Sequence, residues 1–307
     1  MRDFLGLAAA VIARDPGLAP CRATVEKELL HMEILEALRG IRAFPRLAFK
    51  GGTCLRLCRQ GKRLSEDLDF AAGRDFDAAM MDDLEGVLRD RIASTYGLEV
   101  TVARRSFDRR DRDILARWVA RVVTRPSPGG GTSNIGVQRV KIEVDSSDHP
   151  PGTSPTRAVF PYAHLVMPSR QVLVNAVPVA ATLSDKLVAL PWSIMHRRNP
   201  RYRDVWDLIE YLPTQTGLTS MLESARQRAA EQMQADQYTA LLAEAGDRLP
   251  DVIADGAFEA TMRRFLPHDL AENTIGNADY RRMMVESLQE TFRWLRDPGS
   301  MPRHLRR

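Results

Sequence analysis

One stretch of the chain, residues 46–70, fixes the kind of fold that is possible, because it alternates strand, glycine turn, helix and strand. Short apolar runs flank a glycine pair, and the second run carries Asp67 and Asp69. Strand side chains alternate between faces, so Ser65 and the two aspartates are expected on one face. The elements are expected at 46–50, 51–52, 53–59 and 63–70. The chain therefore needs a sheet and cannot be all-helical.

Two carboxylates on one strand face repel each other unless a cation neutralises them. Carboxylate oxygens suit a hard divalent ion, so Asp67 and Asp69 are candidate ligands for Mg²⁺ (or Mn²⁺). The turn at Gly51, Gly52 and Thr53 opens a helix, and its backbone N–H groups can hold a phosphate. A phosphate turn followed by metal-binding carboxylates indicates nucleotidyl transfer from a nucleoside triphosphate.

A third acid is expected on a neighbouring strand, and the segment at 135–145 supplies candidates. Its alternation predicts Val140, Ile142 and Val144 in the core and Lys141, Glu143 and Asp145 on the opposite face. Glu143 is favoured as the third metal ligand, with Asp145 as the alternative. An ordinary amphipathic strand would show the same pattern.

The 307-residue chain divides by character. The first part, 1–175, predicts an α+β domain, in which a small mixed sheet is flanked by helices. Residues 114–125 and 135–145 are expected to pair as antiparallel strands across a loop at 126–134. An all-helical region at 176–307 follows, in which Pro191 is expected to kink or end its helix. The helices are expected at 181–196, 201–212, 217–230, 235–246, 256–264 and 277–296.

A second group of charged residues lies in the helical region. Lys186 stands among apolar residues of its helix and would be costly to bury without a partner. Asp204 and Asp207 are three residues apart, so they share one face of the next helix. The lysine can serve a triphosphate, with either aspartate as the key acid, or it can form a purely structural ion pair.

The net charge of +4 permits an anionic partner without requiring one. Arginines recur on the strand at 117–125 and again at 197–203, where they could follow a phosphate backbone. A solvated basic face is the alternative for each. No stretch is long enough to span a membrane, and a cytoplasmic location is expected.

These motifs resemble the AbiEii-type nucleotidyltransferase toxins of the polymerase-β-like superfamily. Its pattern GG(S/T)xL followed by RxSxDhDF is matched at 51–55 and 63–70, and a lysine helix and an RDxxDL helix are matched at Lys186 and 203–208. The resemblance covers residues 22–212 in blocks, whereas 213–307 carries no matching motif.

The resemblance implies a nucleotidyltransferase core and transfer of a nucleoside monophosphate from an NTP to RNA, notably the 3′ end of tRNA. Such a reaction would block translation, be restrained by an antitoxin encoded nearby, and could serve in phage defence. The implied catalytic residues are Asp67, Asp69, Glu143, Lys186, Asp204 and Asp207, and the implied nucleotide-binding residues are Gly51, Gly52, Thr53, Arg63, Ser65 and Lys186. Transfer to protein hydroxyls or to a small molecule such as an antibiotic is the alternative, as is an inert binding relative.

Overall fold

The structure is a computed structural model that describes residues 1–73, 76–110, 113–125, 136–146, 154–167, 171–212 and 217–305. The chain forms two compact units, Met1–Val177 and Pro178–Arg307. The division lies two residues beyond the expected boundary at 175. The loop expected at 126–134 lies outside the described residues.

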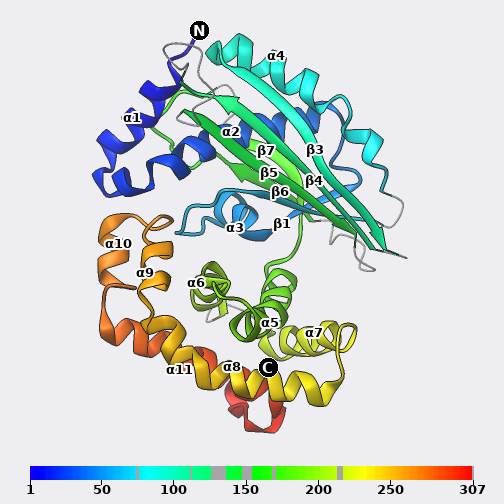
Figure 1. Cartoon of the computed structure of the whole chain (residues 1–307), viewed down its shortest axis with the longest axis vertical. Coiled ribbons are helices and arrows are strands. Elements are labelled where there is room, and N and C mark those ends of the chain that lie inside the picture. The colour runs from blue at the N-terminus through cyan, green and yellow to red at the C-terminus, as the bar shows by residue number, and fades with distance from the viewer. Residues whose placement is uncertain are drawn as a thin grey trace. The chain divides into compact units, whose positions relative to one another are not determined.

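The first unit is built on a seven-stranded mixed sheet in the order β3-β4-β5-β2-β1-β7-β6 (Figure 1). The strands are β1 Leu47–Lys50, β2 Leu68–Ala72, β3 Glu99–Arg110, β4 Asp113–Val123, β5 Val137–Ser146, β6 Ser154–Val159 and β7 Gln171–Ala176. β2 runs parallel to β5 and β1 parallel to β7, while the other neighbours are antiparallel. The expected antiparallel pairing of β4 with β5 and the α+β class are confirmed.

Helices cover one face of this sheet. They are α1 Phe4–Arg14, α2 Arg22–Gly40, α3 Gly51–Arg59 and α4 Leu84–Tyr96, with the 3₁₀ turns η1 Pro16–Cys21 and η2 Ala78–Met81. α2 contacts β5, β7 and α4, and in Figure 1 it lies behind the strands. Val140, Ile142 and Val144 are fully buried in the same core as the apolar residues of α2, as their alternation predicts. The opposite face of β5 is left for the polar side chains.

The second strand begins later than the expected residue 63. The residues just before β2 form hydrogen bonds with side chains instead of with a neighbouring strand. Ser65 donates its backbone N–H to Glu28 Oε1 at 3.4 Å. The Thr53 hydroxyl likewise donates to the carbonyl oxygen of Asp67. Asp67 therefore lies just before β2, while Asp69 lies within it.

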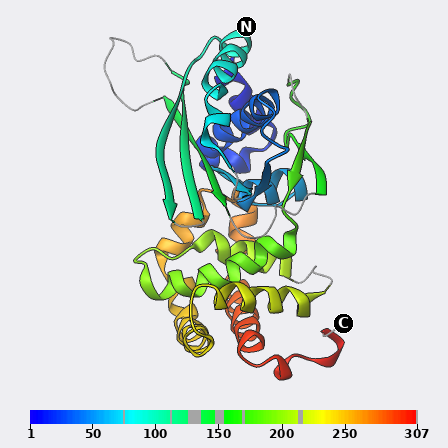
Figure 2. The same cartoon turned by 90° about the vertical axis from the view of Figure 1, so that its right-hand side faces the viewer.

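The described residues of the second unit form helices joined by short turns, with no strand among them, and Figure 2 shows the unit from a second side. Its helices are α5 Val179–His196, α6 Tyr202–Tyr211, α7 Leu218–Ala230, α8 Ala235–Ala254, α9 Gly256–Met262, α10 His268–Asn273 and α11 Ala278–Arg296, followed by η4 Pro298–Ser300 and η5 Arg303–Leu305. α5 packs on α7 and α8, and α8 packs on α11, around a core of its own. None of the helices in the described ranges combines the length and apolar character that a membrane crossing requires.

Pro191 does not end its helix, because α5 continues through it to His196. A proline removes the N–H that would bind the carbonyl four residues earlier, which here belongs to Leu187. The buried hydroxyl of Tyr238 on α8 donates to that Leu187 carbonyl at 3.1 Å. A side chain from a neighbouring helix thus replaces the missing backbone donor.

Candidate active site

The glycine turn and the second aspartate are packed directly together. Lys50 of β1 lies opposite Asp69 of β2, so the turn that follows Lys50 begins beside this carboxylate. Gly51 has φ +75°, and a Cβ on it would lie 2.3 Å from Asp69 Oδ2. Both the backbone conformation and the contact therefore require glycine at this position.

The hydroxyl of Thr53 holds the first aspartate in place. Thr53 is fully buried and donates to the Asp67 carbonyl, so its side chain orients the chain before β2. Because the Thr53 hydroxyl is used in this bond, an anion at the turn would bind the backbone N–H groups at the start of α3. The threonine thus connects the turn to the aspartate motif.

The register of the sheet brings a third carboxylate to the same place. Asp69 of β2 and Glu143 of β5 are neighbours on parallel strands, so their side chains lie on the same face. Asp145, the alternative, is two residues further on and forms an ion pair with Lys50, with 2.6 Å from Nζ to Oδ2. Glu143 is therefore the acid adjacent to Asp69.

Lys141 occupies the space among these acids. Its Nζ lies 3.1 Å from Asp67 Oδ2 and 3.7 Å from Glu143 Oε1, and its side chain is 50% exposed. Partial burial lowers the pKa of Lys141, but the charges of Asp67, Glu143 and Asp69 together raise it above the usual lysine value. Three carboxylates thus act on one cation at the surface of the sheet.

The donor set is chemically suited to Mg²⁺, which prefers carboxylate oxygens, and the lysine ammonium marks where positive charge is stabilised. As arranged here, the described residues contain no group of three or more His, Cys, Asp or Glu side chains that could hold a metal ion. Arg117 adds a further cation, because its Nε lies 2.9 Å from Glu143 Oε1. A metal would therefore have to replace ion pairs, and Lys141 and Arg117 are exposed enough to move.

Arg63 and Ser65 are both buried, each 4% exposed, and both pack against Gly52. A Cβ on Gly52 would lie 2.3 Å from an Arg63 guanidinium nitrogen and 3.0 Å from the Ser65 hydroxyl. Arg63 also donates to the Leu64 carbonyl at 3.0 Å. In this structure the two side chains support the glycine turn from within.

Glu28 of α2 forms hydrogen bonds with both α3 and the segment that contains Ser65. It is fully buried and accepts hydrogen bonds from Arg56 Nε at 3.0 Å and from the Tyr162 hydroxyl at 2.7 Å. The negative charge of Glu28 thus pairs with Arg56 of α3, and Glu28 also accepts a hydrogen bond from the Ser65 backbone. The network fixes α3 and the segment before β2 relative to each other.

The second charged group forms within the helical unit. Lys186 of α5 lies against Asp204 of α6 and has its Nζ 3.0 Å from Asp207 Oδ2. The three side chains are 8%, 5% and 2% exposed. Arg201 also pairs with Asp204. Burial alone raises the pKa of Asp204, but Lys186 and Arg201 lower it well below the usual range.

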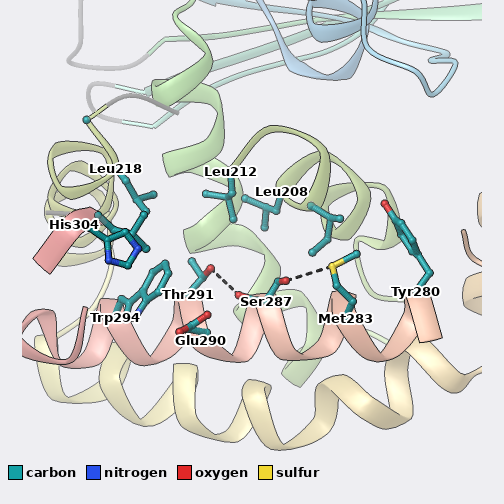
Figure 3. A pocket seen from close by; sticks show the side chains of 13 residues that line it. Leu208, Leu212, Leu218, Tyr280, Met283, Ser287, Glu290, Thr291, Trp294 and His304 are labelled. Carbon is teal, nitrogen blue, oxygen red and sulfur yellow. Dashed lines mark hydrogen bonds between the residues drawn. The ribbon is translucent and has the colours of Figure 1, made fainter. Parts of the chain in front are cut away.

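Two pockets in the helical unit differ in chemistry. One, of about 440 Å³, is mainly apolar; in Figure 3 Leu208, Leu212 and Trp294 are among the side chains around it. The other, of about 610 Å³, includes Asp204 in its lining together with four arginines. The second pocket is called the basic pocket below, and its lining residues are Arg197, Asn199, Pro200, Arg201, Tyr202, Arg203, Asp204, Ala257, Ala260, Thr261 and Arg264.

A mixed sheet that gathers carboxylates beside a glycine turn is the kind of core on which nucleotidyl transfer is carried out. The family described as "Nucleotidyl transferase AbiEii toxin, Type IV TA system" matches residues 33–297, and the chain belongs to this family. It is thus a nucleotidyltransferase toxin of a type IV toxin–antitoxin system, a family that implies a nucleotide substrate and a cognate antitoxin.

Solved structures with a similar chain path include the nucleotidyltransferase toxin MenT4 from Mycobacterium tuberculosis, at 19% identity and a TM-score of 0.48. The match covers 94% of this chain and 99% of that one. JHP933 from Helicobacter pylori is 17% identical, with a TM-score of 0.47 and coverage of 90% and 92%. No curated protein matches the chain.

Sequence reasoning placed Lys141 on the acidic face but gave it no part in the site. It matched residues 26–28 to the E-K-[DE] helix of the family but gave Glu28 no role. The alternation of Lys141 with Glu143 along one strand was the available signal for the first. The family motif was the signal for Glu28, but its partners come from α3 and from residue 162, which no local pattern indicates.

Proposed function

We propose that the chain transfers a nucleoside monophosphate from an NTP to an RNA acceptor, the 3′ end of tRNA, in a Mg²⁺-dependent reaction that blocks translation. The observation that supports this best is that Asp69 lies beside Glu143 in the sheet and against Gly51 of the turn. Asp67 and Glu143 also contact the same ammonium group, that of Lys141. An acceptor of this kind would be met in the cytoplasm, and such a toxin could act in phage defence.

Asp67, Asp69 and Glu143 would hold the Mg²⁺ or Mn²⁺, which supplies neutralisation of the charge on the phosphates. Lys141 would move aside to solvent, since half of its side chain is already exposed. The backbone N–H groups of Gly51, Gly52 and Thr53 bind the phosphates, and Arg63 and Ser65 keep that turn in shape.

The reaction forms a bond between the acceptor hydroxyl oxygen and the α-phosphorus and breaks the bond from the α-phosphorus to the β-phosphate bridging oxygen. The pyrophosphate takes the electron pair of the broken bond. Glu143, whose side chain is 26% exposed, accepts the proton of the hydroxyl.

Lys186 is proposed to contact the triphosphate, with Asp204 or Asp207 orienting it. Both aspartates touch the lysine, so both remain candidates for the orienting acid. The burial of this group also suits a structural ion pair, and a double variant of Lys186 and Asp207 separates the two roles.

The test uses each of four radiolabelled NTPs with Mg²⁺, total RNA, total protein and a panel of aminoglycosides as acceptors. We expect label in RNA with wild type and none with Asp69→Asn. Asp90→Asn, an exposed acid on α4, is the matched control and should label as wild type does. Label confined to protein or to the small molecules would overturn the RNA acceptor, and label in none of them would overturn the transferase reaction proposed here.

A further inference from the structure

A stacked aromatic pair lies at the surface at the end of α5. The rings of Trp192 and His196 are 4.9 Å apart at an interplanar angle of 19°. His196 Nδ1 lies 2.9 Å from the Trp192 carbonyl oxygen, which fixes the imidazole ring in this position. Trp192 is nevertheless 42% exposed, and His196 is exposed as well. A large aromatic surface is thus held rigid without being buried.

Arg197 joins this pair to the basic pocket. Its guanidinium carbon lies 5.5 Å from the centre of the Trp192 ring, and the same residue lines the pocket. One side chain therefore contacts both the aromatic surface and the arginine-lined hollow, so the two form one continuous surface. We call the combination of the basic pocket with Trp192 and His196 the aromatic–arginine surface.

The charges around the pocket favour an anion. Its lining contains one carboxylate, Asp204, which pairs with Arg201 of the lining and with Lys186. The lining has three further arginines, at 197, 203 and 264. The guanidinium carbons of Arg203 and Arg264 lie 4.9 Å and 5.8 Å from the centre of the Phe265 ring. Stacking on a ring restricts a guanidinium, so less entropy is lost when it binds a phosphate.

A basic groove that follows phosphates, next to aromatic rings that stack on bases, is the combination by which proteins hold single-stranded nucleic acid. An isolated exposed tryptophan would mean little. Here it is stacked, oriented by a hydrogen bond and joined to a pocket of about 610 Å³ through Arg197.

We propose that the aromatic–arginine surface of the helical unit binds the single-stranded part of the RNA acceptor. Bases extend the stack of Trp192 and His196, and the backbone phosphates enter the basic pocket. This inference rests on the proposed RNA acceptor and assigns it a binding site. Duplex RNA is expected to bind more weakly, because its internal bases are already stacked on each other and cannot extend this stack.

The first test measures binding alone, with the full chain, a fluorescein-labelled single-stranded RNA of about ten nucleotides, and neither NTP nor Mg²⁺. We expect Trp192→Ala to weaken binding about tenfold, while Trp192→Phe stays within about threefold because the ring can still stack. In the double variant Arg197→Ala, Arg264→Ala, the negative slope of log K against log salt should become shallower by about 1.4, since two phosphate contacts are lost.

Arg248→Ala is the matched control, because Arg248 is an exposed arginine of the same unit that does not line the pocket. It should leave binding unchanged. The proposal is overturned if Trp192→Ala binds as wild type, if Arg248→Ala has the same effect as the pocket variants, or if duplex RNA binds equally well. It is also overturned if unlabelled NTP displaces the RNA from wild type and if the pocket variants bind NTP more weakly. That result would assign the pocket to the nucleotide.

A second measurement separates this inference from the proposed function. In the transfer assay, Trp192→Ala should raise KM for RNA about tenfold and leave KM for NTP unchanged. If wild type labels RNA and Trp192→Ala has no effect on either KM, only the binding surface is overturned. If RNA binds through Trp192 but no nucleotide is transferred to it, the proposed reaction fails and the binding surface stands.

Discussion

The Nζ atom of Lys141 lies 3.1 Å from Oδ2 of Asp67. Lys141 belongs to β5, which is far along the chain from Asp67. The same ammonium reaches Glu143, and the charge of Asp69 acts on it too. A lysine thus lies where the proposed metal would bind. The two cations would compete for the same carboxylates, and this competition can be measured.

Lys141→Met removes the ammonium and leaves three carboxylates repelling one another. We expect its melting temperature to fall below that of wild type in EDTA and to rise more than that of wild type as Mg²⁺ is added. Thermal unfolding across a Mg²⁺ series checks this. Arg139→Met, an exposed basic residue on the same strand, is the control. An equal Mg²⁺ response in Lys141→Met and wild type would contradict competition at this site.

Gly51→Ala places a Cβ against Asp69 Oδ2 and forces alanine to adopt φ +75°. We expect a loss of about 1–3 kcal/mol in the free energy of unfolding and a loss of transferase activity. Gly86→Ala is the matched control, since it lies in α4 with no atom within 4 Å of the added carbon. It should change stability by no more than about 1 kcal/mol, in the stabilising direction. Urea unfolding distinguishes the two, and equal stability of both variants would argue against the close packing at Gly51.

Lys186→Met leaves Asp204 and Asp207 buried with one cation fewer, and we expect it to cost about 3–5 kcal/mol in unfolding free energy. Lys186→Met with Asp207→Asn removes one charge of each sign and leaves the pair of Arg201 with Asp204 intact. This double variant should recover most of the stability. If it also recovers transfer and growth arrest, Lys186 is structural; continued loss of both supports its proposed role at the triphosphate.

Asp204 predicts a particular dependence of stability on pH. Its pKa is lowered in the folded protein by Lys186 and Arg201, so the unfolded chain binds the proton more readily. The stabilisation is present above the unfolded value of about 3.9 and is lost as pH falls from there through the lower folded pKa. The difference in unfolding free energy between wild type and Asp204→Asn should therefore shrink on acidification. A difference that stays constant as pH falls from neutral to about 2 would contradict the pKa shift.

Tyr238→Phe removes the donor that the Leu187 carbonyl accepts beside Pro191. We expect a loss of about 1–3 kcal/mol in unfolding free energy, because a buried carbonyl is left without a partner. Pro191→Ala restores the backbone N–H, so the same tyrosine substitution should cost less in that background. A double-mutant cycle by urea unfolding measures the coupling, and strictly additive effects would show that the two residues act independently.

The local elements of the site could be predicted from the sequence because they depend on short-range patterns. The glycine turn, the helix after it and the inward-facing Val140, Ile142 and Val144 follow from backbone freedom and from alternation. The family motif at 51–70 needed no structure either. The start of β2 could not be predicted, since a hydrogen bond accepted by Glu28 and one donated by Thr53 replace the ladder there.

By itself, then, the sequence determined the elements around the motifs, the acids available to the site and the family. It did not indicate β6, β7 or α10. Only the tertiary structure decided that Glu143 rather than Asp145 lies next to Asp69, because register between strands depends on pairing across the sheet. It likewise decided that Lys141 lies among the acids and that Tyr238 allows α5 to continue through Pro191. These contacts join residues far apart in the chain, and no local pattern specifies them.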